Sequence, residues 1–108
     1  MIIFEKGQSH LLFDEKNGYL DQIEYNGRTI SLRSKLWKIE TSDGILEIND
    51  MTSFKTQAYS DMLKLFWENE KALVTVTLRA GDDGKVYWNI NVDLYDGRGV
   101  NKVIFPMG

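Results

Sequence analysis

Residues 85–97, KVYWNINVDLYDG, decide the fold that the sequence predicts. Polar and apolar side chains alternate strictly here, which is typical of a β-strand with two different faces. One face carries only large apolar side chains and is expected to face a core: Val86, Trp88, Ile90, Val92 and Leu94. The other face lacks lysine and glutamate and carries phenols, amides and a carboxylate: Tyr87, Asn89, Asn91, Asp93 and Tyr95.

The rest of the chain repeats this pattern between hairpin turns. Asn-Gly and Asp-Gly pairs, which tolerate the positive φ angles of tight hairpins, separate runs rich in β-branched and aromatic residues. We therefore expect strands at residues 2–5, 9–13, 19–25, 28–32, 36–42, 45–48, 54–59, 62–68, 71–79, 85–95 and 100–105. Short strands joined in meandering hairpins predict an all-β, antiparallel β-sandwich, with residues 1–108 as a single domain or as a fragment of a longer chain.

The composition argues against several kinds of site. The chain of 108 residues has no cysteine, so it has neither a disulfide nor a thiolate metal site. The net charge of −3, with no basic cluster, argues against nucleic acid as a partner, and no apolar run approaches the roughly 20 residues of a membrane span. His10 is the single histidine and is expected to be a surface or capping residue rather than a catalyst. No motif suggests a catalytic residue, a metal ligand or a cofactor.

The register of the second half of the chain is also predictable. A two-residue turn after Glu68 would place Leu65 opposite Val74, and a five-residue loop after Arg79 would place Val74 opposite Ile90. This register gathers the apolar residues on one face. The opposite, outer face is then half apolar, with Phe66 beside Leu73. Met62, Phe66 and Leu73 are the predicted interface residues on this face.

We expect a partner to cover this outer face, because exposed apolar patches often mark interaction sites. Three occupants fit: a second layer from the rest of a longer polypeptide, a homo-oligomer or other protein, and a glycan. A glycan suits the phenols, amides and carboxylate, because aromatic rings stack on pyranose C–H groups and the polar groups bind hydroxyls. The candidate glycan-binding residues are Tyr87, Asn89, Asn91, Asp93 and Tyr95.

Three stretches resemble galactose-mutarotase-like β-sandwich domains: LLFDEKNGYLDQIEYNGRTI (11–30), LWKIET (36–41) and residues 74–108. The first resembles the opening strand, Asn-Gly turn and second strand of such domains. The last resembles their long hairpin, followed by a strand with a central tryptophan and a strand ending in Phe-Pro. Such domains begin large, often bacterial, glycoside-hydrolase-like proteins.

The resemblance implies a non-catalytic accessory domain, or the first part of one, in a carbohydrate-active protein. Mutarotase activity is not implied, because His10 does not fit the role of the catalytic histidine in those enzymes. The alternative is a stand-alone interaction module that self-associates through its half-apolar sheet face.

Overall fold

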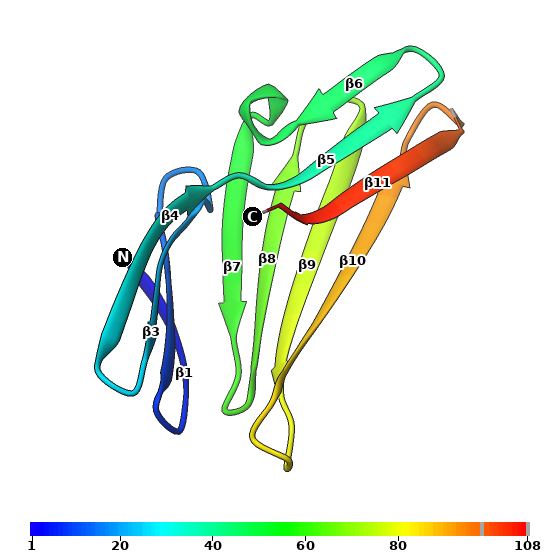
Figure 1. Ribbon diagram of the computed structural model, residues 1–108. Helices are drawn as coiled ribbons and strands as arrows, with labels where there is room; N and C mark the ends of the chain where they lie inside the picture. The colour runs from blue at the N-terminus through cyan, green and yellow to red at the C-terminus, as the bar shows by residue number, and fades with distance from the viewer. Residues whose placement is uncertain (98, 108) are drawn as a thin grey trace.

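The computed structural model describes residues 1–97 and 99–107 as antiparallel strands with one short 3-10 helix (Figure 1). The strands are β1 (Ile2–Lys6), β2 (Ser9–Phe13), β3 (Leu20–Tyr25), β4 (Arg28–Ser34), β5 (Leu36–Thr41), β6 (Gly44–Glu47), β7 (Ser53–Ala58), β8 (Met62–Glu68), β9 (Ala72–Ala80), β10 (Val86–Leu94) and β11 (Val100–Met107). The 3-10 helix, η1 (Ile48–Asp50), was not predicted. The all-β, antiparallel prediction is confirmed. Residues 98 and 108, within the predicted domain and the resembling stretch 74–108, lie outside the described residues.

The strands form three sheets. The N-terminal sheet has the order β1-β2-β3-β4, the long sheet β10-β9-β8-β7 and the crossing sheet β11-β5-β6. In Figure 1, β5 and β11 pass obliquely over the upper parts of β8, β9 and β10. The hydrophobic core lies on the inner face of the long sheet, and both other sheets contribute side chains to it.

Aromatic contacts join the sheets across this core. The Phe13 ring of the N-terminal sheet lies 6.5 Å from the Trp88 ring on β10. From the crossing sheet, Trp37 lies 5.8 Å from Trp67, and Phe105 lies 6.1 Å from Trp88. Trp37 and Trp67 are almost completely buried, whereas Trp88 is half-buried.

The predicted faces of β8, β9 and β10 are confirmed, but the predicted register is wrong by two residues. Leu65 pairs with Val76 rather than with Val74. Val74 in turn pairs with Val92 rather than with Ile90. A shift of two residues returns every side chain to the same face, so hydrophobic alternation alone does not distinguish the two registers.

The loop between β8 and β9 explains the register. The Asn69 side chain accepts the backbone N–H of Lys71 at 2.8 Å and that of Ala72 at 3.0 Å. The Asn69 N–H also donates to the Ala72 carbonyl at 3.0 Å. These bonds close the loop so that Glu68 faces Leu73, instead of the tighter turn that would place it opposite Lys71.

A sharp corner between β4 and β5 carries the chain from the N-terminal sheet to the crossing sheet. Arg33 and Leu36 have φ angles of 49° and 68°, a region that is costly for residues with a side chain. The Ser34 hydroxyl oxygen accepts the Leu36 N–H at 3.1 Å, and the Leu36 side chain is fully buried. Local hydrogen bonding and core packing therefore stabilise a corner that the sequence pattern does not indicate.

Gly18 marks a close approach between the β2–β3 turn and the long sheet. Its φ is 76°, and a Cβ at this position would lie 2.5 Å from the Trp67 ring and 2.6 Å from the Phe54 ring. The Trp67 indole N–H donates to the carbonyl of neighbouring Asn17 at 2.8 Å. The turn can approach this closely only because residue 18 has no side chain.

We expect Gly18→Ala to lower the free energy of unfolding by about 2–4 kcal/mol, because it adds both positive-φ strain and overpacking against two rings. Gly27→Ala is the matched control: its φ is 78°, but no atom lies within 4 Å of its Cβ position. Strain alone should therefore cost the control about 1–2 kcal/mol. Urea unfolding measures both variants. If both variants lose the same free energy of unfolding, the close packing of Gly18 against the long sheet contributes nothing to stability.

Candidate functional site

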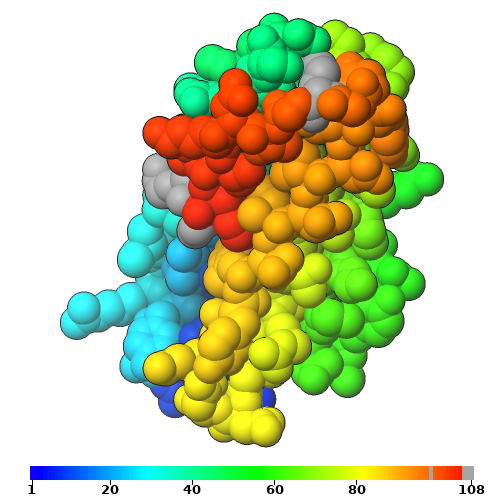
Figure 2. Space-filling model, turned by 90° about the vertical axis from the view of Figure 1, so that its right-hand side faces the viewer, coloured from blue at the N-terminus to red at the C-terminus, as the bar shows by residue number. Residues whose placement is uncertain are grey.

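The candidate site is the outer face of β10, which we call the β10 strip: Tyr87, Asn89, Asn91, Asp93 and Tyr95. All of these side chains are exposed on the face opposite the core, with 44% of Tyr87 and 48% of Tyr95 accessible to solvent. Tyr95 follows the last residue of β10, and its N–H continues the ladder by donating to the Lys71 carbonyl at 2.9 Å. Figure 2 shows β10, yellow to orange, along the side of the molecule turned to the viewer.

Tyr87 is fixed at one end of the strip. Its hydroxyl donates to Asp83 Oδ2, and Asp83 Oδ1 accepts the Lys85 N–H at 3.0 Å. The Arg79 guanidinium lies 5.2 Å from the centre of the Tyr87 ring, within the range of a cation–π contact. The hydrogen bond from Tyr87 lowers the pKa of Asp83, and the same bond raises the pKa of Tyr87.

Tyr95 is fixed in the same way at the other end. Its hydroxyl donates to Glu68 Oε2, at the end of β8. This hydrogen bond stabilises the protonated phenol and raises the pKa of Tyr95 to about 12. Both phenols are therefore anchored to carboxylates, and each ring is held in a defined orientation above the long sheet.

The middle of the strip has free hydrogen-bonding capacity. Asn89, Asn91 and Asp93 are exposed, and no side-chain hydrogen bond to any of the three is found within residues 1–97 and 99–107. Each amide offers two donors and an acceptor, and the carboxylate offers acceptors only. The structure thus places all five predicted glycan-binding residues on one exposed face.

The predicted interface residues lie on the same outer face, on β8 and β9, and Leu73 pairs directly with Asp93 of the β10 strip. Met62, Phe66 and Leu73 are all half-buried. Phe66 pairs with Thr75, and Leu73 pairs with Glu68, so the predicted side-by-side placement of Phe66 and Leu73 is wrong. The cause is the two-residue register shift described above. Threonine and charged side chains lie between the apolar residues of this face. The assignment of Met62, Phe66 and Leu73 to an interface stays a prediction.

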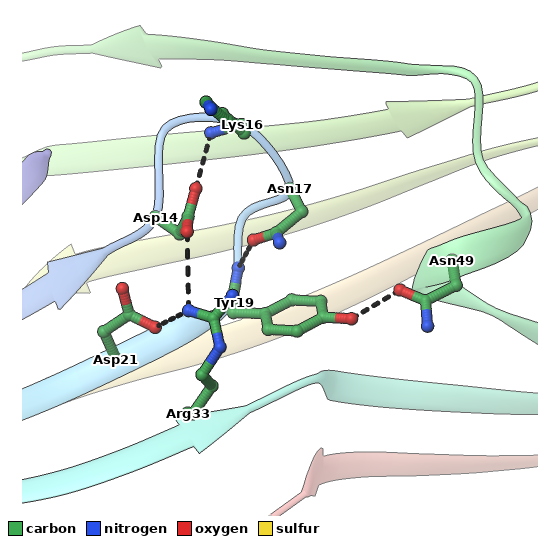
Figure 3. Close-up of polar contacts among 7 residues, drawn as sticks. All are labelled: Asp14, Lys16, Asn17, Tyr19, Asp21, Arg33 and Asn49. Carbon is green, nitrogen blue, oxygen red and sulfur yellow. Dashed lines mark hydrogen bonds and ion pairs between the residues drawn. The ribbon is translucent and has the colours of Figure 1, made fainter.

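A second polar cluster, the Arg33 cluster, was missed in the sequence: Asp14, Tyr19, Asp21, Arg33 and Asn49 (Figure 3). Arg33 Nη1 lies 2.8 Å from Asp21 Oδ1 and 3.4 Å from Asp14 Oδ2. The guanidinium stands 4.9 Å from the centre of the Tyr19 ring, whose hydroxyl donates to Asn49 Oδ1. Its members come from the β2–β3 turn, β3, β4 and η1.

The Arg33 cluster has a structural role. A backbone hydrogen bond from Lys16 lowers the pKa of Asp14, and the hydrogen bond from Arg33 acts in the same direction. The pairing with Asp14 and Asp21 favours charged Arg33, whose pKa is raised. The members thus satisfy one another and leave little capacity for a ligand. No local sequence motif could have revealed the cluster, because Arg33 meets partners from separate strands.

Hollows elsewhere on the surface are weaker candidates for a binding site. One of about 330 Å³ opens between the β5–β6 hairpin and the β8–β9 loop, with Asp43, Asp50 and Glu70 among its lining residues. No group of three potential metal ligands is present among the described residues.

His10 is half-exposed on the N-terminal sheet, with Nδ1 3.3 Å from Glu24 Oε2. Within the described ranges, no helix has the length and apolar character to span a membrane.

No family model, curated protein or solved structure matches this chain. The resemblance to galactose-mutarotase-like domains therefore stays a prediction. The chain is an all-β, antiparallel domain with an anchored polar and aromatic strip on an exposed strand.

We expect the Tyr95 phenol to titrate with a pKa of about 12 rather than 10.0. Because the folded pKa is raised, the stabilisation from this bond is complete below pH 10 and is lost as the pH rises to 12. The tyrosinate absorbance of the native protein, with Tyr95→Phe as the reference, measures the titration. Glu68→Gln should lower the Tyr95 pKa. An ordinary Tyr95 pKa in the native protein would contradict the observed anchoring.

Proposed function

We propose that this chain is a non-catalytic domain of a carbohydrate-active protein and that the β10 strip contacts a glycan. The observation that carries the proposal is the strip itself. Two anchored phenols flank Asn89, Asn91 and Asp93, whose side chains are exposed and have no hydrogen-bond partner in the described part of the chain. Exposed edge strands commonly carry charged side chains, lysine especially, and the β10 strip has no lysine.

The chemistry of the strip suits saccharides. Sugar hydroxyls donate and accept hydrogen bonds, and the two amides do both, while Asp93 accepts only. The anchoring of Tyr87 by Asp83 and of Tyr95 by Glu68 reduces the entropy that ring stacking would otherwise cost. Nearly half of each tyrosine surface remains accessible for such stacking.

The proposal includes the finer fold assignment, an accessory portion of a galactose-mutarotase-like β-sandwich. Two features support it: antiparallel sheets that contact one another across an aromatic core, and the consecutive hairpins from β7 to β10. The rest of a longer polypeptide or a homo-oligomer is the partner proposed for the half-apolar face at Met62, Phe66 and Leu73.

A glycan array probed with the full chain tests the proposal by selecting a saccharide for amide NMR titration. We expect that saccharide to shift the amides of the β10 strip. Tyr87→Ala and Asn89→Ala should each weaken binding about fivefold, as expected for one net hydrogen bond or stacking contact. Gln57→Ala, on the exposed β7 edge of the same sheet, is the control and should bind as the parent does.

Two results would overturn the proposal. The first is a saccharide that binds with the same affinity to Tyr87→Ala, Asn89→Ala and the parent chain. The second is an array on which no saccharide retains the parent chain more strongly than the Tyr87→Ala variant.

A further inference from the structure

β10 is an edge strand with an unpaired side. The long sheet has the order β10-β9-β8-β7, and within the described residues β10 pairs only with β9. Gly81 N–H donates to the Lys85 carbonyl at 2.8 Å, and Tyr95 N–H donates to Lys71. Since hydrogen-bonded positions alternate in an antiparallel ladder, odd-numbered β10 residues bond to β9. The even-numbered residues direct their backbone groups away from β9: Val86, Trp88, Ile90, Val92 and Leu94.

The other sheet edges carry features that discourage pairing with another chain. Lysine is present in β1 and β7, at Lys6 and Lys55, and arginine begins β4 at Arg28. β11 contains Lys102 and Pro106, and β6 has only four residues. Natural edge strands use lysine, proline, irregularity and short length to avoid adding a further strand.

β10 has none of these features. It is nine residues long, contains no lysine, arginine or proline, and pairs with β9 without a bulge. Its inner face is apolar but only half-buried along its whole length, whereas the corresponding residues of β8 and β9 are buried. β10 is therefore an open edge strand, with unpaired backbone donors and acceptors and with apolar surface that a partner can cover.

We propose that β10 pairs with β10 of a second copy of this chain, antiparallel and about a two-fold axis at Ile90. The two long sheets then form one continuous sheet. A second copy is the occupant because the strand is complementary to itself about this residue, as a two-fold interface requires. On the inner face Ile90 meets Ile90 of the second copy, and Trp88 meets Val92.

The outer face is equally self-complementary. Asn89 lies opposite Asn91 of the second copy, and Tyr87 lies opposite Asp93. These are the non-hydrogen-bonded pairs, in which side chains on neighbouring strands approach most closely. Amide meets amide and phenol meets carboxylate, so no like charges are directly opposed. The pairing does not rest on glycan binding, and it joins two β10 strips into one wider surface.

Sedimentation equilibrium of the full chain tests this pairing, with charges introduced at exposed positions. Asn89→Lys/Asn91→Lys places lysine opposite lysine, and Asn89→Asp/Asn91→Asp places aspartate opposite aspartate. Each double variant should raise the dimer dissociation constant about tenfold or more, since like charges directly opposed on paired strands repel. Mixing the two variants should restore association as a heterodimer. Gln57→Lys, on the exposed opposite edge of the long sheet, should dimerise as the parent does.

Hydrogen exchange gives a second readout that does not depend on a variant. The amides of Trp88, Ile90 and Val92 should gain protection as the protein concentration rises. The amides of Asn89 and Asn91, which already bond to β9, should change little. No saccharide is present in either experiment, so failure of the glycan proposal would leave these results unaffected.

Three outcomes would overturn the pairing. A parent chain that remains monomeric up to about 1 mM has no affinity in the range expected of a stable dimer. A dimer that tolerates both double variants is not paired at β10. Concentration-dependent shifts of the Phe66 and Leu73 side-chain NMR signals, without added protection of the Ile90 amide, would assign self-association to the half-apolar face.

Discussion

The burial of Trp67 is the constraint on which the arrangement of the three sheets depends. Its ring lies 5.8 Å from Trp37 of the crossing sheet and 5.2 Å from Phe54 of β7. Its indole N–H donates to the Asn17 carbonyl in the turn of the N-terminal sheet. One side chain therefore contacts all three sheets, and the glycine at position 18 leaves the room that this contact needs. Aromatic pairs of this kind stabilise by about 0.5–1.5 kcal/mol beyond their buried area.

The sequence predicts which face each strand presents, but not the register between strands. Alternation along β8, β9 and β10 has a period of two residues, so any even shift preserves it. The Asn69 side chain selects the actual register through its hydrogen bonds to the backbone N–H groups of Lys71 and Ala72. The presence of an asparagine in a loop does not by itself predict these hydrogen bonds. The corner at Leu36 was unpredictable for a related reason, because a positive φ at a buried leucine depends on tertiary packing.

The same distinction holds for the site. The five residues of the β10 strip could be placed on one face from the sequence because exposure follows alternation. The hydrogen bond between Tyr95 and Glu68 could not be predicted from the sequence, because 27 residues separate the two and only the correct strand register brings them together. The Arg33 cluster follows no local sequence pattern, because Arg33 on β4 pairs with Asp21 on the neighbouring strand β3 and with Asp14 in the β2–β3 turn.

β10 shows why a clear strand pattern is not evidence of a buried strand. Its alternation is the most regular in the chain, yet its inner face is only half-buried. Phe13 and Phe105 both contact Trp88, and the remaining apolar residues of the strand are partly covered by other core side chains. Alternation reports which side of a strand is apolar, and not whether the fold supplies enough partners to cover that side. The shortage of cover and the open backbone edge occur on the same strand. A neighbour that pairs with the edge would also extend the apolar layer, and it would leave the β10 strip accessible on the opposite face.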